Sequence, residues 1–323
     1  MMKSLRNLLL AAAALFAAAG AQAQAYPKQP LRLVLPFAAG GLADVIGRLT
    51  AQKMGEALGQ AVVVENVAGA GGTLAGAQVA HATPDGYTLL HANASTLTIT
   101  PSLYRNLAYD PEKSFVPIGP VAQFSFVMGA TNALPANNLK ELIAYARANP
   151  GKLNYASPGF GTTPHLAAEM LKKAAGINLV HVPYKGAGQA AQALMAGDVQ
   201  IFFDAPALLV PLVQSGKIKA LAVTSPQRMR ELPQVATAAE SGVKEIEFST
   251  WTVWVAPAAT PPEAVNLLRG TLAKVMASAE MREALAARGF DNFNATPEEI
   301  SRLIRTDTPR WAEIIRGAGI KVE

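Results

Sequence analysis

The sequence predicts an α/β protein of two domains, each built on a mainly parallel sheet covered by helices. Short apolar runs alternate with helical patterns along most of the chain, which favours parallel strands with helices on the sheet faces. The chain has 323 residues and half of them are hydrophobic, which is enough for two cores. A glycine turn leads from a strand into a helix once in each half, at Ala39–Asp44 and at Ser157–His165.

The first 25 residues, Met1–Ala25, have the features of a secretory signal peptide. Lys3 and Arg6 give a basic start, Leu8–Ala19 an apolar centre, and Ala21–Ala23 or Ala23–Ala25 a small-x-small cleavage site. The apolar centre is too short for a membrane anchor, and no later apolar run is long enough to span a bilayer. We therefore expect an exported protein of the bacterial periplasm.

Composition excludes several kinds of site. The sequence contains no cysteine, so disulfides, thiolate metal sites and a cysteine-linked lipid anchor are excluded. The four histidines show no metal-ligand spacing, and we expect neither a metal nor a cofactor. The net charge of +5 is spread without a basic cluster, which argues against a nucleic-acid partner.

In the first domain, three predicted strands each end in a small or polar loop. Leu31–Leu35 forms the first strand, which Pro36 ends because proline cannot donate to the sheet. Ala38–Gly41 follow with almost no side chain, and a helix with an apolar face begins behind them. Because a helix N-terminus exposes N–H groups and a partial positive charge, this turn suits a carboxylate. The other two strands are Ala61–Asn66 and Tyr87–His91, and their loops are Gly69–Thr73 and Asn93–Thr98.

The chain is expected to cross between domains at least twice. Phe115–Ala130 contains apolar runs broken at Pro117 and Pro120, which predict strands leading to the second domain. Ser249–Ala256, with Trp251 and Trp254 as core or hinge residues, predicts the return. The expected boundaries are 26–125 plus 250–323 for lobe 1 and 126–249 for lobe 2. Because ligands bind beyond the carboxyl ends of such strands, the glycine turns should share one cleft.

The remaining elements follow the same alternation. Helices are predicted over Asn138–Asn149, Thr163–Ala175, 187–196, Ala207–Gln214, Pro262–Ala277, Met281–Arg288 and Pro297–Gly319, and strands over Asn154–Ala156, Leu179–Pro183, Val199–Phe203 and Ile218–Val223.

Two glycine turns invite enzyme interpretations that their motifs do not support. A dinucleotide fingerprint at Gly69–Gly72 would need a small residue where Leu74 stands, and no P-loop is present. Ser157 lies in a strand-to-helix turn, but a nucleophile elbow needs glycine where Tyr155 stands. An exported serine hydrolase that combines Ser157 with His165 or His181 and with Asp204 remains an alternative.

The carboxylates admit several roles. Asp44, in the first turn of its helix, is expected to bind free N–H groups rather than ligand. Asp204 ends an apolar strand, where it could accept from a ligand ammonium or hydroxyl, or hold backbone N–H groups in place.

Short motifs in order along the mature chain resemble the Bug family, the periplasmic solute-binding receptors of tripartite tricarboxylate transporters. They are Pro-Phe-x-x-Gly-Gly-x-x-Asp at 36–44, Glu65-Asn66 leading to Gly69–Gly72, Pro84–Leu89, Pro101–Tyr104, Tyr109–Pro111, Phe115–Ile118, Ser157–Thr162 with His165–Ala167, Val182–Gly186, Gly197-Asp198 and Phe203-Asp204.

The resemblance implies a two-lobed periplasmic binding protein of the Venus-flytrap kind, type II-like. It implies no enzymatic activity, and a small organic carboxylate held in the cleft mainly by main-chain N–H groups and waters. Its partners would be the membrane permease subunits of a tripartite tricarboxylate transporter or, alternatively, a membrane sensor protein. Carried over by position, the ligand contacts would be Phe37, Ala39, Gly40, Gly41, Gly71, Gly72, Thr73, Ser95 and Thr96 in lobe 1, and Gly159, Phe160, Gly161, Thr162, Thr163, Tyr184 and Asp204 in lobe 2.

Three departures from the family pattern concern the ligand. The usual Asn-Arg-Pro-Gly is Asn66–Gly69 with Val and Ala in the middle, which removes a cation near the cleft. Leu42-Ala43 replace residues that often carry a hydroxyl, and Phe160 stands where the family is often polar. These changes predict a ligand with an apolar portion beside its carboxylate.

Overall fold

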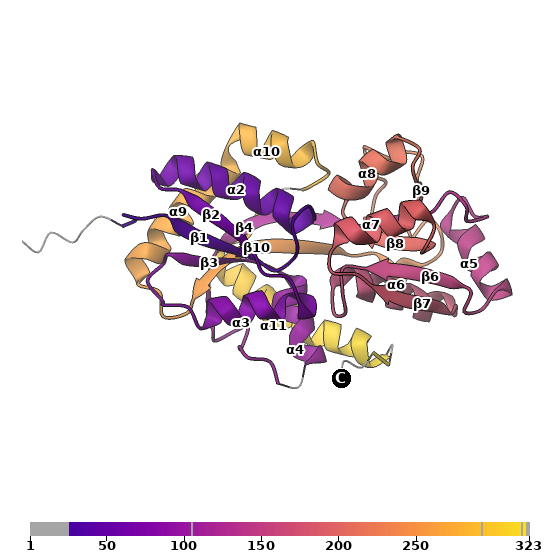
Figure 1. Ribbon diagram of the computed structural model, residues 1–323, viewed down its shortest axis with the longest axis horizontal. Helices are drawn as coiled ribbons and strands as arrows, with labels where there is room; N and C mark the ends of the chain where they lie inside the picture. The colour runs from indigo at the N-terminus through magenta and orange to yellow at the C-terminus, as the bar shows by residue number, and fades with distance from the viewer. Residues whose placement is uncertain (1–25, 105, 292, 318, 321–323) are drawn as a thin grey trace, which may run out of the picture.

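The computed structural model describes residues 26–104, 106–291, 293–317 and 319–320. The predicted signal peptide, Met1–Ala25, lies outside the described residues. Two lobes, each with its own sheet, lie side by side and are joined by long strands (Figure 1).

The sheet of lobe 1 has five strands in the order β2-β1-β3-β10-β4. β1, β2 and β3 are parallel, and β10 is antiparallel to both of its neighbours, so the sheet is mixed. The strands are β1 Leu31–Leu35, β2 Val62–Asn66, β3 Thr88–Asn93, β4 Phe115–Ser125 and β10 Ser249–Pro257.

The sheet of lobe 2 repeats this plan in the order β7-β6-β8-β5-β9. β6 is parallel to β7 and β8, and β5 is antiparallel to β8 and β9. The strands are β5 Val127–Ala130, β6 Leu153–Ser157, β7 Leu179–Pro183, β8 Ile201–Asp204 and β9 Lys219–Val223.

Helices cover both faces of each sheet (Figure 1). In lobe 1, Leu33 packs with Ile46 on one face while its neighbour Val34 packs with Val79 on the other, as alternation along a strand requires. Among the described residues, no helix is both long and apolar enough to cross a membrane. The helices are α2 Leu42–Leu58, α3 Thr73–Ala80, α4 Thr100–Leu103, α5 Leu139–Ala148, α6 Thr163–Ala175, α7 Ala187–Ala196, α8 Pro206–Gln214, α9 Pro262–Ala277, α10 Ala279–Ala286 and α11 Pro297–Gly317, with short helical turns η1 Ala70–Gly72, η2 Ser95–Ile99 and η3 Lys244–Ile246.

Two local predictions were wrong. Asn93–Thr98 was expected to be a loop, but Ser95–Ile99 is a wide helical turn that continues into α4. Thr98 and Thr100 donate their hydroxyls to the carbonyls of Ala94 and Thr96, at 2.8 and 2.9 Å, so the hydroxyl groups of this run are satisfied inside the helix.

The prolines of Phe115–Ser125 were expected to break the strand, yet β4 is continuous. β4 lies at the edge of its sheet, where a missing N–H is tolerated. Its pairing with β10 shifts register between Thr252 and Val253 and again between Trp254 and Val255, so the irregularity is absorbed by local bulges.

The chain crosses between the lobes at Phe126 and again next to Phe248, and Thr224 joins the two crossings. The Thr224 hydroxyl accepts the N–H of Phe126 and donates to the carbonyl of Phe248, both at 2.8 Å. The main chain of Thr224 bonds the same two residues, through its N–H to Phe126 at 2.9 Å and its carbonyl to Phe248 at 3.0 Å. One buried threonine therefore fixes the separation of the two connecting strands.

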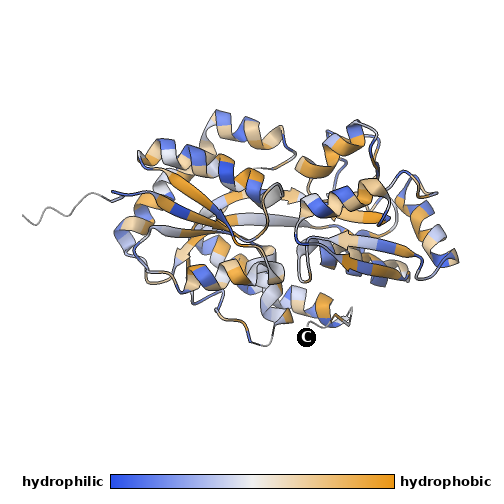
Figure 2. Ribbon diagram, viewed as in Figure 1, coloured by the Kyte–Doolittle hydropathy of each residue, from blue (hydrophilic) through white to orange (hydrophobic). Residues whose placement is uncertain are grey.

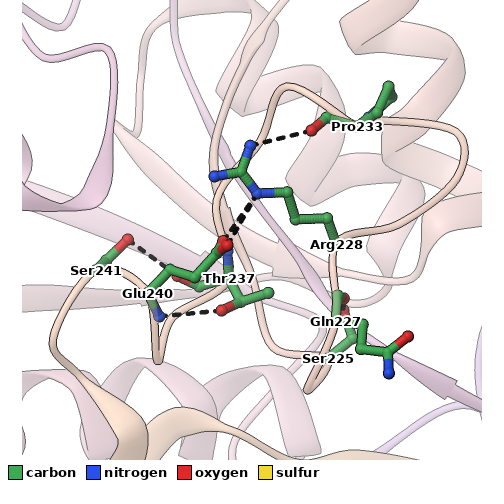
Figure 3. Close-up of polar contacts among 7 residues, drawn as sticks. All are labelled: Ser225, Gln227, Arg228, Pro233, Thr237, Glu240 and Ser241. Carbon is green, nitrogen blue, oxygen red and sulfur yellow. Dashed lines mark hydrogen bonds and ion pairs between the residues drawn. The ribbon is translucent and has the colours of Figure 1, made fainter.

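The segment between β9 and β10 is held by its own polar contacts (Figure 3). Glu240 accepts from the N–H of Thr237 at 2.8 Å, and the hydroxyl of Thr237 accepts the N–H of Glu240 at 3.0 Å, as in a capping box. The Arg228 guanidinium donates to both carboxylate oxygens of Glu240 and to the carbonyl of Pro233. These contacts order the return path to lobe 1.

Aromatic side chains pack around the crossings. Phe124 and Phe126 have ring centroids 5.3 Å apart, Phe126 lies 5.5 Å from Phe248, and Phe248 lies 6.1 Å from Trp311. One hydrophobic cluster therefore runs from lobe 1 into lobe 2. Figure 2 shows hydrophobic residues concentrated in the strands and in stripes of the helices, with hydrophilic residues on the outer helix faces.

Candidate functional site

A small cavity lies between the lobes, where the strands of both sheets end. Its volume is about 60 Å³. Among the described residues, no lysine or arginine lines it, and Asp204 is its one ionisable lining group. The lining residues are Phe37, Gly41, Asn93, Ser95, Phe124, Phe126, Pro158, Thr162, Thr163, Pro164, Ala187, Asp204, Thr250 and Thr252.

The N-termini of three helices meet at this cavity. Gly41 precedes α2, Thr162 precedes α6, and Ala187 is the first residue of α7. None of the three helices has a side-chain cap hydrogen bond at its N-cap residue. A helix start carries a partial positive charge and N–H groups outside the helix's own bonds, although at α6 the N–H of Thr163 is already bonded to Ser95 and Pro164 has none. The cavity therefore favours an anion, mainly at the starts of α2 and α7, although no cationic side chain of the described residues lines it.

A polar network fixes the turn that precedes α2. Asp44 accepts from the N–H of Gly40 at 3.0 Å and from Arg48 Nε at 2.8 Å. Asn66 donates to the carbonyl of Phe37 at 2.9 Å and to Asp44 at 3.1 Å. Burial alone would raise the pKa of Asp44, but the hydrogen bonds from Arg48, Gly40 and Asn66 outweigh it and lower that pKa. Asp44 therefore holds the turn, and the N–H of Gly40 is already bonded.

The lobes touch along both sides of the cavity. Ser95 of lobe 1 accepts the N–H of Thr163 of lobe 2 at 3.1 Å, and the two hydroxyls are 3.2 Å apart. A Cβ atom on Gly41 would lie 3.7 Å from that of Ala187, and one on Gly71 would lie 2.8 Å from the carbonyl oxygen of Phe160. The glycine turns of the two lobes therefore face each other at close range.

Asp204 lies at the end of β8 and is 3% exposed. Its Oδ1 accepts the N–H of Ala205 at 2.8 Å. Burial raises the pKa of Asp204 to about 7, and this single neutral donor lowers it only in part. The carboxyl group can therefore be either protonated or ionised near neutral pH.

Behind the lobe 2 turn, two histidine rings stack with their centroids 4.2 Å apart. His165 Nδ1 accepts the N–H of Gly161 at 3.3 Å, which supports the turn at 159–163. Burial lowers the pKa of His165 to about 4, and burial together with the charge of His165 lowers that of His181 to about 3. Both rings are therefore neutral at neutral pH, as the acceptor role of His165 requires.

Of the catalytic triad that the serine hydrolase alternative requires, the structure shows only a contact between a serine and a histidine. Ser157 Oγ and His181 Nε2 lie 2.6 Å apart, within hydrogen-bond distance. However, Ser157 is fully buried, and His181 Nδ1 has no hydrogen-bond partner among the described residues. Asp204 instead bonds the adjacent main chain. The pair thus lacks the carboxylate that orients a catalytic histidine.

The predicted ligand residues fall into four groups. Gly71, Gly72, Thr96 and Gly161 are buried without lining the cavity, Thr73, Gly159 and Tyr184 are half-buried, and Ala39, Gly40 and Phe160 are exposed. The six that line the cavity are Phe37, Gly41, Ser95, Thr162, Thr163 and Asp204.

Sequence reasoning missed the part of the lining that comes from the crossing strands. Phe124 and Phe126 are two residues apart, as are Thr250 and Thr252, so each pair points to one side of its strand. Thr250 and Thr252 stand among the mostly apolar residues of β10. Two hydroxyls at this spacing indicate that one side of the strand faces a polar space. The other residues missed were Asn93, Pro158, Pro164 and Ala187.

In the part of the chain that the structure describes, no group of three or more histidine and acidic side chains could hold a metal ion. Trp251 and Trp254 are buried in the core, as predicted, and donate to Asp307 at 3.1 Å and to His91 at 3.2 Å.

Comparison with known proteins identifies the family. Residues 46–320 match the family described as tripartite tricarboxylate transporter family receptor. The periplasmic binding protein BugD is 39% identical, with a TM-score of 0.88 over 92% of this chain and 100% of BugD. An R. palustris protein solved with adipate is 32% identical, with a TM-score of 0.89 over 92% of this chain and 99% of its own. MatC from Rhodopseudomonas palustris, solved with bound malate, is 31% identical, with a TM-score of 0.86 over 90% of this chain and 100% of MatC. A two-lobed chain whose helix N-termini meet at an interlobe cavity, and which matches these proteins over nearly its whole length, belongs to the Bug family of periplasmic solute-binding receptors.

Proposed function

We propose that the interlobe cavity binds a small organic carboxylate and that the protein delivers it for uptake. The observation that carries this proposal is the meeting of three helix N-termini at a cavity that no lysine or arginine among the described residues lines. N–H groups at helix starts bind carboxylates without a cationic side chain. The relatives solved with adipate and with malate support the same ligand class.

The proposed ligand carries an apolar portion beside its carboxylate. The rings of Phe37, Phe124 and Phe126 and the small side chain of Ala187 supply most of the cavity wall. The polar side chains of the lining come from the strand ends, the helix starts and β10, and they are Asn93, Ser95, Thr162, Thr163, Asp204, Thr250 and Thr252. An acid with one end among the N–H groups would thus place its carbon chain against the aromatic rings.

We propose that ligand is captured by closure of the two lobes, 26–125 plus 250–323 and 126–249. Closure brings Ser95 to Thr163 and Gly71 to Phe160, contacts that exist only when the lobes meet. Burial of the site then strengthens each N–H hydrogen bond, because water no longer competes. The closed form would be the one that membrane permease subunits of a tripartite tricarboxylate transporter bind.

A second candidate partner is a membrane sensor protein that reads the same closed form as a signal. Co-purification of the protein with each membrane fraction, with and without ligand, separates cargo delivery from signalling. We propose no enzymatic role, since Ser157 is buried and His181 lacks an orienting carboxylate among the described residues. Turnover of chromogenic esters that Ser157→Ala abolishes would contradict this.

A thermal-shift screen with adipate, malate, benzoate and citrate tests the proposal. A carboxylate that binds should raise the melting temperature, since a thousandfold excess over the dissociation constant adds roughly 4 kcal/mol of stability. Acids with an apolar portion should act at lower concentrations than citrate.

Two matched variants locate the site. Ala187→Leu places a larger side chain in the cavity wall and should abolish the shift, whereas Gln192→Leu, an exposed change on the same helix, should keep it. If no acid shifts the wild-type protein, or if Ala187→Leu responds as the wild type does, the proposed site is wrong.

A further inference from the structure

The carboxyl group of Asp204 lies in a cavity arranged for an anion. β8 ends on Asp204, and its side chain lines the cavity together with the starts of α2, α6 and α7. Of its two oxygens, Oδ1 accepts the Ala205 N–H, whereas Oδ2 has no bond to another described residue. A negative charge on Asp204 would therefore compete with a bound carboxylate for the same positive helix ends.

No cationic side chain among the described residues compensates that charge. The elements beside Asp204 that carry no ionisable side chain are β5, β10, α7 and α8. On α6, Lys172 bonds Glu169 at 2.6 Å, and Glu169 also accepts from Tyr155 of β6. The α6 histidine, His165, is stacked on His181 of β7 and both are neutral.

Across the cleft, the charges of lobe 1 are also engaged with one another. Asp44 and Arg48 of α2 form an ion pair at 2.8 Å. His91 of β3 is buried and accepts the indole N–H of Trp254 at 3.2 Å. Among the described residues that line the cavity, Asp204 is thus the one whose protonation can change when a ligand binds.

We propose that Asp204 recognises the bound acid as a protonated carboxyl group, so that above neutral pH each carboxylate enters together with one proton from solvent. This inference rests on the proposed function. Two carboxylates inside a cavity of about 60 Å³ cannot both remain ionised without a cation between them. The proton would reside on Oδ2, because Oδ1 accepts the Ala205 N–H, and Oδ2–H would then donate to the ligand.

A ligand ammonium would be the other natural partner for Asp204, but two of the side-chain acceptors that line the cavity already accept from lobe residues. An ammonium group has three donors to satisfy. Asn93 Oδ1 already accepts the N–H and the hydroxyl of Thr96, both at 3.1 Å. Ser95 Oγ already accepts the N–H of Thr163. An acid without an amine therefore fits better.

The test is isothermal titration of the full mature protein with adipate, malate and benzoate at pH 6.5 and pH 8.5. With a pKa near 7 in the free protein, the dissociation constant should rise about tenfold or more between these pH values. Titrations at pH 8.5 in two buffers of different ionisation enthalpy should show uptake of close to one proton per acid bound.

Asp204→Asn provides a permanent donor in the same place. In this variant the dissociation constants at pH 8.5 and pH 6.5 should differ by less than about twofold, and binding should take up no proton. Asp198→Asn, an exposed change, should keep the wild-type pH dependence and proton uptake.

The outcomes separate the two proposals. If none of the three acids binds at either pH, the proposed function fails and this inference fails with it. If an acid binds with equal affinity at both pH values and without proton uptake, only the inference is overturned. Tight binding of aspartate that Asp204→Asn abolishes would overturn it in favour of an ammonium partner.

Discussion

Gly71 occupies a position in which any side chain would separate the lobes. Its φ of 66° lies in the left-handed region, and a Cβ atom there would meet the carbonyl oxygen of Phe160 at 2.8 Å. Because that oxygen belongs to the other lobe, relief of the clash would require the lobes to move apart. We infer that glycine is needed here for closure as well as for the turn.

Gly71→Ala should therefore weaken carboxylate binding at least tenfold, about 1.4 kcal/mol, as measured by titration calorimetry. The matched control is Gly188→Ala in α7, where an added Cβ meets nothing within 4 Å. That variant should bind as the wild type does. Equal affinities for Gly71→Ala and Gly188→Ala would show that the Gly71–Phe160 contact has no part in binding.

Individual residues also show where prediction from sequence reaches its limit. The start of α2 was predicted as an anion site, and Gly41 does line the cavity, but the N–H of Gly40 is bonded to Asp44. Local sequence places both glycines in one turn. It does not tell which amide faces the cleft, because that depends on a bond between Asn66 and Phe37, 29 residues apart.

At the scale of elements, Thr224 makes both crossings depend on one side chain. Its hydroxyl bonds Phe126 N–H and Phe248 carbonyl at 2.8 Å each, in a buried position. Thr224→Val keeps the shape and leaves both main-chain groups without that partner. The free energy of unfolding should fall by roughly 2–4 kcal/mol, since each unsatisfied buried group costs about 1–3 kcal/mol.

Urea denaturation measures this loss. Thr306→Val, an exposed change in α11 that removes only a local hydroxyl bond to Leu303, should cost less than about 0.5 kcal/mol. If Thr224→Val were as stable as Thr306→Val, the buried hydroxyl would not be what connects the crossing strands.

Elements with a strong local pattern were predicted closely. The helices Thr163–Ala175 and Pro262–Ala277 and the strand Leu179–Pro183 were confirmed to the residue. The helical turn at Ser95–Ile99 was missed because its helix depends on threonine hydroxyls that bond the preceding turn, in a sequence of low helix propensity. The continuity of β4 was missed because its prolines are tolerated only at a sheet edge, which the sequence does not reveal.

The residues that line the cavity also differ in whether the sequence predicted them. Residues at strand ends and glycine turns, such as Phe37 and Thr162, were predicted through the resemblance to the Bug family, whose motifs include them. Phe124, Phe126, Thr250 and Thr252 were missed because their position beside the cavity results from the angle at which the crossing strands join the lobes. That angle is a property of the assembled fold.

At the scale of the whole molecule, the buried carboxyl group of Asp204 should make the fold less stable as the pH rises toward neutrality. Burial raises the pKa of Asp204 from 3.8 to about 7, so its protonated form stabilises the fold fully below pH 3.8. As the pH rises from 3.8 to about 7, the unfolded chain releases this proton more readily than the folded protein does, and up to about 4 kcal/mol of stability is lost.

Asp204→Asn removes this titration. The quantity to compare is the melting temperature of the variant minus that of the wild type, in the absence of ligand. This difference should be larger at pH 8.5 than at pH 4 by at least about 3 °C. Differential scanning fluorimetry at the two pH values measures it. The same relative melting temperature at both pH values would mean that Asp204 has an ordinary pKa in the folded protein.

The position of β10 has a consequence for the order in which the chain can fold. All five strands of the lobe 2 sheet come from one continuous segment, Val127–Val223, whereas β10 lies between β3 and β4 and is the last strand in the sequence. The lobe 1 sheet therefore cannot be completed until the chain has been synthesised through Ser249–Pro257. Its completion pairs β10 with β3 and β4, which lie more than 120 residues earlier in the chain. We expect lobe 2 to become compact first. A chain that still lacks β10 would expose the unpaired edges of β3 and β4, and aggregation would start at these edges.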